Sequence, residues 1–181
     1  ASSPVDSAFV YEAPSGGGGG DLEGANGWFL DANANGLNNG TSWTDAWESL
    51  SAVSWASMQN GDTLYISGEP SDTTIYSTSG VTIGRSNVTI TRGLSDEHNG
   101  LPLIRGTGTL TGDLLSISAT STVSRSNIKI NNLGFDNCRT GIRINGRYSG
   151  TYVDSVTISN CVFTNFHYAS LEINGLELTS N

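Results

Sequence analysis

The strongest constraint on the fold is an internal repeat in the second half of the chain. Three hexapeptides, Arg85–Ile90, Arg125–Ile130 and Val153–Ile158, share one alternation of apolar and polar residues. The last two lie 28 residues apart and the first two lie 40 apart. Alternation with a period of two predicts strands that bury one face. The return of one strand at such a spacing is typical of a solenoid whose coils stack on one another.

The match between the last two coils extends beyond these strands. Asn132 aligns with Asn160, and Phe135 aligns with Phe163. The further matches are Asn137 with Asn165, and Ile144-Asn145-Gly146 with Ile173-Asn174-Gly175. Equivalent positions should therefore stack about 4.8 Å apart, with Phe on Phe inside and with asparagine amides hydrogen-bonded along the corners. The longer offset predicts a variant coil that uses Leu114, Leu115 and Ile117.

Composition supports an all-β chain and excludes several other classes. Only 14% of the 181 residues are charged, and 23 are glycine, which argues against disorder and against a coiled coil. The formal charge is −9 and Lys129 is the sole lysine, so a nucleic-acid-binding surface and an anionic membrane partner are not expected. No apolar run reaches the length of a membrane span, so no membrane insertion is expected.

The region before the repeat has the pattern of an N-terminal cap. Gly27-Trp28-Phe29-Leu30 reads as a strand, and Thr63-Leu64-Tyr65-Ile66 reads as another, after a Gly61-Asp62 turn. Between them, Ser42 and Asp45 form a capping-box-like pair. The apolar stripe that follows consists of Trp47, Leu50 and Val53, and it predicts a helix.

Together with the repeat, this opening resembles the secreted right-handed parallel β-helix proteins of the pectin-lyase-like family. The residues that carry the resemblance are Trp28–Asp31, Asn38–Ser42, Ala46-Trp47, Leu50 and Gly61–Leu64. The resemblance implies an all-β fold, a right-handed parallel β-helix (solenoid) with an N-terminal capping helix. The chain length predicts about five rungs. We divide the chain into a flexible N-terminal tail (1–20), an N-terminal cap with a short helix (21–61) and a parallel β-helix (62–181).

The family includes lyases, hydrolases, tailspikes, adhesins and non-catalytic solenoids, so the resemblance does not fix the function. A lyase of this fold would use a basic residue to abstract a proton, and Lys129 and Arg143 are the candidates. Both should point outward and can share a face, but no acidic cluster is expected beside them. A hydrolase needs two positioned carboxylates. Asp113, Asp136, Asp154 and Glu172 fall at scattered coil positions, and no pair stands out.

Two further patterns leave alternatives open. Asp31-Ala-Asn33-Ala-Asn35-Gly matches the first half of a calcium loop, so Asp31, Asn33 and Asn35 are candidate Ca²⁺ ligands; a plain Asn/Gly turn is the alternative. An aromatic group near the last complete coil can form a sugar-stacking strip or pack a loop. Its members are Tyr148, Tyr152, His167 and Tyr168.

The cysteines and the sequons carry smaller predictions. Cys138 and Cys161 fall in different columns of the stack, which favours two buried thiols over a disulfide. Asn39-Gly-Thr41 and Asn87-Val-Thr89 match the N-glycosylation pattern, as many triplets do by chance. The chain begins at Ala1, which a secreted protein would show after loss of its signal peptide, and which a trimmed chain would show as well.

The tail and the end of the chain suggest a function. The apolar segment Ala8, Phe9, Val10 and Tyr11 is tethered by five glycines, Gly16 to Gly20. Such a strand can dock on its own domain or on the sheet edge of a neighbour, and a disordered terminus is the alternative. The last coil has no lid in its sequence. We therefore expect an extracellular, non-catalytic structural subunit that polymerises head-to-tail through this strand. The alternatives are a truncated carbohydrate-active enzyme, a polysaccharide lyase or glycoside hydrolase, and a fragment of a glycan-binding adhesin or tailspike.

Overall fold

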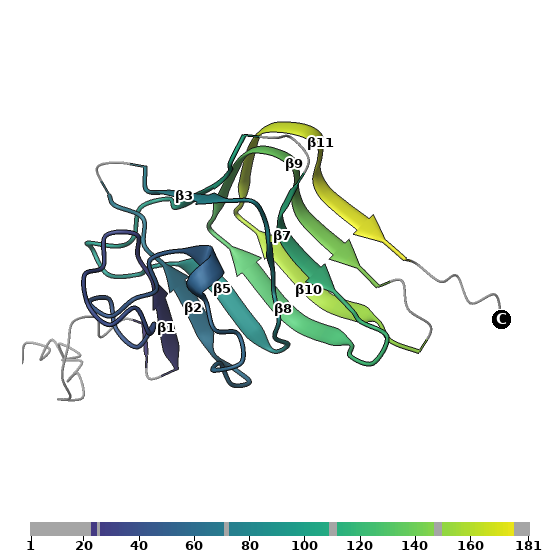
Figure 1. Ribbon diagram of the computed structural model, residues 1–181, viewed down its shortest axis with the longest axis horizontal. Coiled ribbons are helices and arrows are strands. Elements are labelled where there is room, and N and C mark those ends of the chain that lie inside the picture. Colours follow the sequence, from purple (N-terminus) through teal and green to yellow (C-terminus); the bar gives the residue numbers. More distant parts are fainter. Residues whose placement is uncertain (1–22, 25, 71–72, 109–111, 147–149, 176–181) are drawn as a thin grey trace, which may run out of the picture.

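The computed structural model describes residues 23–24, 26–70, 73–108, 112–146 and 150–175. In these parts the chain forms a parallel β-solenoid of about 4 turns with almost no helix (Figure 1). The strands are β1 (Gly27–Leu30), β2 (Thr63–Ile66), β3 (Ile75–Thr78), β4 (Val81–Thr82), β5 (Val88–Arg92), β6 (Leu103–Gly106), β7 (Asp113–Ser118), β8 (Arg125–Asn131), β9 (Gly134–Asn145), β10 (Val153–Ser159) and β11 (Val162–Asn174). A single 3-10 turn, η1 (Leu50–Ala52), precedes β2.

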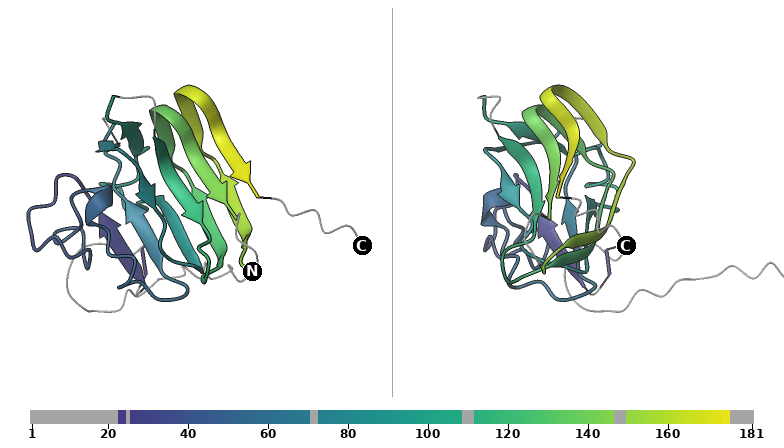
Figure 2. Two further views of the ribbon diagram at one scale, coloured as in Figure 1. Left: turned by 45° about the vertical axis from the view of Figure 1, so that its right-hand side comes forward. Right: turned by 90° about the vertical axis from the view of Figure 1, so that its right-hand side faces the viewer.

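Two parallel sheets enclose the core. One sheet has the order β1-β2-β5-β8-β10, and the other has the order β3-β6-β9-β7-β4, with β11 paired to β9. Figure 2 shows successive coils stacked in chain order, so that β10 and β11 lie at one end of the described solenoid. Each described pairing between named strands is parallel, which is the arrangement that the repeat predicts.

The register confirms the alignment that the repeat gave. Val156 pairs with Ile128, and Val88 pairs with the same residue from the other side. Phe163 pairs with Phe135, and their rings stack with centroids 5.0 Å apart and planes 13° apart. These apolar positions face inward, where burial of aliphatic and aromatic side chains supplies most of the stabilisation of a coil.

Asparagines occupy the corners because they tolerate left-handed backbone better than other residues with a side chain. Asn132 and Asn160 have φ values of 56° and 51°, and Asn127 has 51°. The predicted amide contact along a corner is present where Asn127 Nδ2 donates to Asn87 Oδ1 at 3.2 Å. It is not formed by Asn132, whose Nδ2 donates to Asn131 Oδ1 at 2.9 Å. At another corner it is replaced, because Asn165 Nδ2 donates to the carboxylate of Asp136 instead.

The turns are about four rather than the expected five because the coils are long. One position of the first sheet recurs once in each turn on the strands β2, β5, β8 and β10. Its residues are Thr63, Thr89, Lys129 and Thr157. Strands β9 and β11 belong to the second sheet, where they have 12 and 13 residues and bend along their length (Figure 1), so each turn uses much of the chain. The estimate from chain length assumed shorter coils.

The cap contains less helix than the sequence predicted. The predicted contact at the cap is present, because Asp45 N donates a hydrogen bond to Ser42 Oγ at 3.0 Å. However, Trp47 is extended and exchanges backbone hydrogen bonds with the β1 segment, to Phe29 O at 2.9 Å and from Asp31 N at 2.8 Å. Backbone groups of Trp47 are thus used by a strand neighbour and cannot continue a helix. Trp47, Leu50 and Val53 are nevertheless buried, so the apolar stripe covers the N-terminal end of the core.

Candidate functional site

The end of the solenoid at β11 carries an exposed apolar column. Leu171 and Ile173 of β11 are in register with Ile142 and Ile144 of β9. The two β9 residues are 0% and 8% exposed, whereas Leu171 and Ile173 are 40% and 57% exposed. The positions are equivalent, and the difference arises because no described strand pairs with the far edge of β11.

The same contrast recurs earlier in the strand. Phe166 of β11 is 46% exposed, although it registers with buried Cys138. We call Phe166, Leu171 and Ile173 the end column. An unpaired strand edge also presents backbone N–H and C=O groups that can accept a further strand. The end of the described solenoid is therefore both apolar and open to main-chain pairing.

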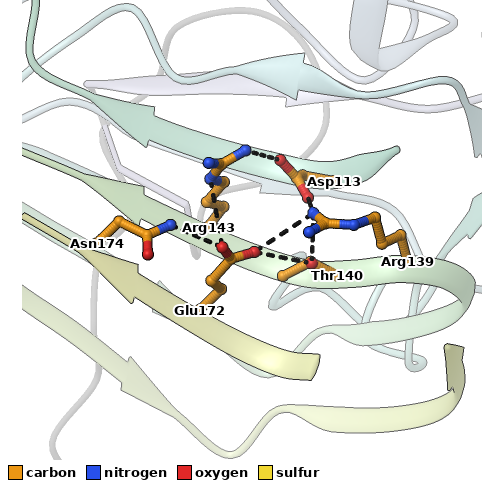
Figure 3. Close-up of polar contacts among 6 residues, drawn as sticks. All are labelled: Asp113, Arg139, Thr140, Arg143, Glu172 and Asn174. Carbon is orange, nitrogen blue, oxygen red and sulfur yellow. Dashed lines mark hydrogen bonds and ion pairs between the residues drawn. The ribbon is translucent and has the colours of Figure 1, made fainter. Parts of the chain in front are cut away.

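A charged cluster bridges three strands of the second sheet (Figure 3). Arg139 Nη1 of β9 lies 3.2 Å from Asp113 Oδ1 of β7 and 3.4 Å from Glu172 Oε2 of β11. Arg143 Nη1 lies 3.1 Å from Asp113 Oδ2. Thr140 Oγ1 donates to Glu172 Oε2 at 3.3 Å. Two cations and two carboxylates thus alternate across the outer surface of successive coils.

The sequence did not predict this cluster. Asp113 and Glu172 were expected to be scattered, and Arg143 was expected to lack acidic neighbours; the structure corrects both expectations. The reason is that β7 and β11 flank β9 on opposite sides, although β7 lies outside the 28-residue repeat. Lys129 is exposed on β8, in the other sheet, so it does not share a sheet face with Arg143.

The electrostatics of the cluster favour fixed ion pairs over proton transfer. Hydrogen bonding from Asn174 Nδ2, at 2.7 Å, and the two arginines lower the pKa of Glu172, against a smaller opposing effect of burial. A general acid in glycoside hydrolysis needs a raised pKa. The Glu172 carboxylate is instead held ionised, as in a structural bridge between coils.

A second group of ion pairs lies along β9, and we call it and the charged cluster the charged ladders. Arg105 Nε lies 2.7 Å from Asp136 Oδ2, while Thr164 Oγ1 and Asn165 Nδ2 donate to Asp136 Oδ1 at 2.9 and 2.8 Å. Burial of Asp136 opposes ionisation, but the hydrogen bonds from Asn165, Thr164 and Arg105 outweigh it and lower its pKa. The outer face of this sheet is thus bound together by carboxylates between cations and amides.

The candidate calcium loop uses its side chains in local contacts. Asp31 Oδ1 accepts from Asn33 N at 2.9 Å, and Asn33 Nδ2 donates to Glu69 Oε1 at 2.6 Å. Asn35 is exposed. In the described ranges, no three His, Cys, Asp or Glu side chains are grouped so that they could hold a metal ion. Calcium at Asp31, Asn33 and Asn35 stays a prediction.

A group that sequence reasoning missed lies beside Asp31. The His98 ring stacks on Trp43, with centroids 3.8 Å apart, and its Nδ1 lies 2.9 Å from Ser67 Oγ and 3.7 Å from Asp31 Oδ2. This group borders a hollow of about 400 Å³ that also includes Glu69, Asp96 and Glu97. In the sequence, only the acidic residues Asp96 and Glu97 next to His98 could have pointed to it, because its members come from four separate segments.

The remaining predicted residues divide as follows. Tyr152 and Tyr168 are both exposed. They belong to different sheets, because Tyr152 directly precedes β10 and Tyr168 lies in β11. The guanidinium of Arg139 lies 4.6 Å from the centre of the Tyr168 ring. His167 is also exposed in β11. Tyr148 lies outside the described residues, as do the candidate contact residues Ala8, Phe9, Val10 and Tyr11.

The thiols and sequons are locally defined. Cys138 and Cys161 are both free, as the column argument predicted, but only Cys138 is buried and Cys161 is partly buried. Burial raises the pKa of both thiols. Asn39 is exposed, and its Oδ1 accepts from Thr41 N and Oγ1. Asn87 is partly buried and its Oδ1 belongs to the corner contact with Asn127.

Comparisons with known proteins add no relative. Within the described parts, no helix has both the length and the apolar character that crossing a bilayer requires. The structure assigns the chain to the parallel β-solenoids by its geometry. No family model, no curated protein and no solved structure matches the chain.

Proposed function

We propose that the chain is a non-catalytic structural subunit that assembles head-to-tail outside the cell. In this proposal the segment Ala8–Tyr11 of one subunit adds as a strand to the β11 edge of the next. The observation that carries the proposal is the end column, whose side chains are exposed although their equivalents one coil earlier are buried. The proposal includes the resemblance to secreted pectin-lyase-like proteins, which the cap and repeat motifs support.

The tail has the composition that a donor strand requires. The segment contains three consecutive apolar residues, Phe9, Val10 and Tyr11, and ends before Pro14. Removal of their apolar surface from water is favourable, so binding to a sheet edge is favoured over exposure. The five glycines that follow form a flexible linker, which lets the segment reach an edge without imposing an orientation on the solenoid. β-Augmentation of this kind takes its affinity from main-chain hydrogen bonds and its specificity from alternate side chains.

Magnitudes indicate that both kinds of contact are needed. Full burial of a Leu, Ile or Phe side chain contributes about 1.5–3 kcal/mol. The end column is about half exposed already, and a strand of four residues spans about 13 Å. It therefore covers Leu171 and Ile173 together, and contributes about 1 kcal/mol for each. Association of two molecules costs at least about 4 kcal/mol. Apolar coverage alone therefore does not hold two subunits together, and pairing of the backbone with β11 has to contribute.

The two ends of the solenoid differ, which makes the proposed contact directional. Trp47, Leu50 and Val53 cover the core at the N-terminal end, whereas the end column is uncovered in the described residues. A contact between unlike ends is heterologous, and it gives an open filament unless the rotation between subunits closes a ring.

A subunit's own tail is the competing occupant of the edge. Residues 12–26 can span up to about 50 Å when extended. Four rungs occupy only about 19 Å. A tail can therefore reach its own β11, and the two arrangements differ in one property: assembly depends on protein concentration, and self-coverage does not.

The test is sedimentation and electron microscopy of the full chain over a range of concentrations. We expect oligomers that grow with concentration, and monomers after deletion of residues 1–20 or after Val10→Asp. Val5→Asp, in the same tail but outside the proposed strand, is the matched control and should assemble normally. Assembly that survives the deletion would overturn the role of the tail, and a full chain that is monomeric at every concentration would overturn the polymer.

A further inference from the structure

A hollow at the opposite end of the molecule has the chemistry of a ligand site. Its volume is about 360 Å³, and Asn26, Gly27, Trp28, Thr41, Gln59 and Asp62 line it. We call it the Trp28 hollow. Pockets for small ligands have volumes of about 300–1,000 Å³ and combine an apolar surface with a few placed polar groups. The Trp28 hollow meets both conditions and lies outside the charged ladders and the end column.

The aromatic wall of the hollow is held rigidly. The Trp28 indole stacks on Trp47, with ring centroids 5.3 Å apart and planes 6° apart. Its Nε1–H donates to Asp62 Oδ2 at 2.7 Å, and Gln59 N donates to the same oxygen at 2.6 Å. Asp62 is buried and fixed by these two bonds. A partly buried tryptophan that is fixed in this way offers apolar surface without an entropic cost on binding.

The polar wall retains hydrogen-bonding capacity. Three polar groups of the wall have no hydrogen-bond partner among the described residues: the Asn26 side chain, Gln59 Oε1 and Asp62 Oδ1. Thr41 Oγ1 donates a hydrogen bond to Asn39 Oδ1 and can still accept one. Most of these free groups are acceptors, and Asn26 adds donors. The complementary ligand is therefore rich in hydroxyl donors and has some acceptors.

The charge of the wall narrows the ligand further. Of the described residues that line the hollow, Asp62 alone is ionisable, and it already receives two hydrogen bonds. These residues therefore do not form the carboxylate cluster that a metal cation requires. No Lys or Arg that could bind an anion is among the described residues that line the hollow. An aromatic surface next to neutral amide and hydroxyl groups suits the apolar C–H face and the hydroxyl edge of a sugar ring. We propose that the Trp28 hollow binds one neutral sugar residue of a glycan.

The test is calorimetric titration of the full chain with methyl glycosides of glucose, galactose, mannose, xylose and N-acetylglucosamine, with tryptophan fluorescence as a second readout. We expect saturable binding of at least one glycoside. Gln59→Ala and Asn26→Ala each remove one hydrogen-bonding side chain and should weaken this binding about fivefold. Both side chains are exposed, so the unfolding midpoint should not change.

Asn35→Ala is the matched control, because Asn35 is exposed and does not line the hollow. It should bind the glycoside as the unaltered chain does. Absence of saturable binding to all five glycosides would overturn the proposal, and so would binding that neither Gln59→Ala nor Asn26→Ala weakens. The result does not depend on assembly, because the hollow lies in the cap and the tail deletion leaves its lining residues in place.

Discussion

Equivalent residues on consecutive coils have different surroundings at the end of the solenoid. Ile144 and Ile173 are the same residue type in the same column, and only their exposure differs. The column was readable from the sequence because Ile144-Asn145-Gly146 and Ile173-Asn174-Gly175 align. The charged ladders could not be predicted from the sequence. Asp113 and Glu172 come close to Arg139 only because folding places their strands, β7 and β11, on either side of β9.

The Ile pair gives a direct measure of what the open end lacks. Ile144→Ala removes a buried side chain and should lower the free energy of unfolding by about 2–5 kcal/mol. Ile173→Ala removes a side chain that is 57% exposed, so the monomer should lose about 1 kcal/mol or less. Urea unfolding of the two variants checks this. Equal losses would show that the end column is covered in solution.

Ionisation of Asp136 and Glu172 should make the solenoid acid-sensitive. The folded-state pKa of each carboxyl lies below its ordinary value of 3.8 or 4.5. A lowered folded-state pKa adds stability that is complete above the unfolded-state value and is lost as the pH falls through the folded-state value. We expect the free energy of unfolding to be level from neutral pH to about 5 and to decline below about 4.5.

The Asp136 variant isolates one ladder. Asp136→Asn removes a titrating group and should flatten part of the acid decline in urea titrations at several pH values. Asp154→Asn is the control, because Asp154 is exposed and forms no ion pair with the described residues. An unchanged pH profile for Asp136→Asn would show that the Arg105 ladder does not act in solution.

For the strands and the cap helix, the sequence pattern predicted the secondary structure correctly only where that structure is compatible with the stacking of coils. The alternation in β8 and β10 gave the correct register, because one buried face fixes it. The helix expected from Trp47, Leu50 and Val53 is only the turn η1. A spacing of three residues satisfied the helix pattern, but the backbone N and O of Trp47 pair with the β1 segment, and an isolated short helix is only marginally stable in water.

The corners between strands depend on backbone conformation more than on side-chain contacts. Asn160 has φ of 51° and its side chain has no hydrogen bond with described residues. Asn160→Gly should therefore leave stability nearly unchanged, whereas Asn160→Val should cost about 1–2 kcal/mol, because a β-branched residue resists the left-handed region. Thermal unfolding of both variants tests this. A large loss for Asn160→Gly would point instead to an amide ladder through this corner.

For the whole molecule, the direction of stacking determines where stability is lowest. Each coil of a solenoid contacts only its neighbours, so an end coil has one stabilising interface where an internal coil has two. The cap supplies the second interface for β1 and β2, while β10 and β11 have one in the described residues. Local opening should therefore begin at β11.

Hydrogen exchange can test both this gradient and the proposed donor strand. In the chain without residues 1–20, amides of β11 should exchange faster than those of β5 and β8. A synthetic peptide of residues 6–15 should slow exchange at β11, because an added strand pairs its backbone and covers Phe166, Leu171 and Ile173. A peptide with the same composition but with Phe9, Val10 and Tyr11 dispersed is the control. If both peptides protect β11 equally, or neither does, the sequence of the tail has no part in closing the solenoid.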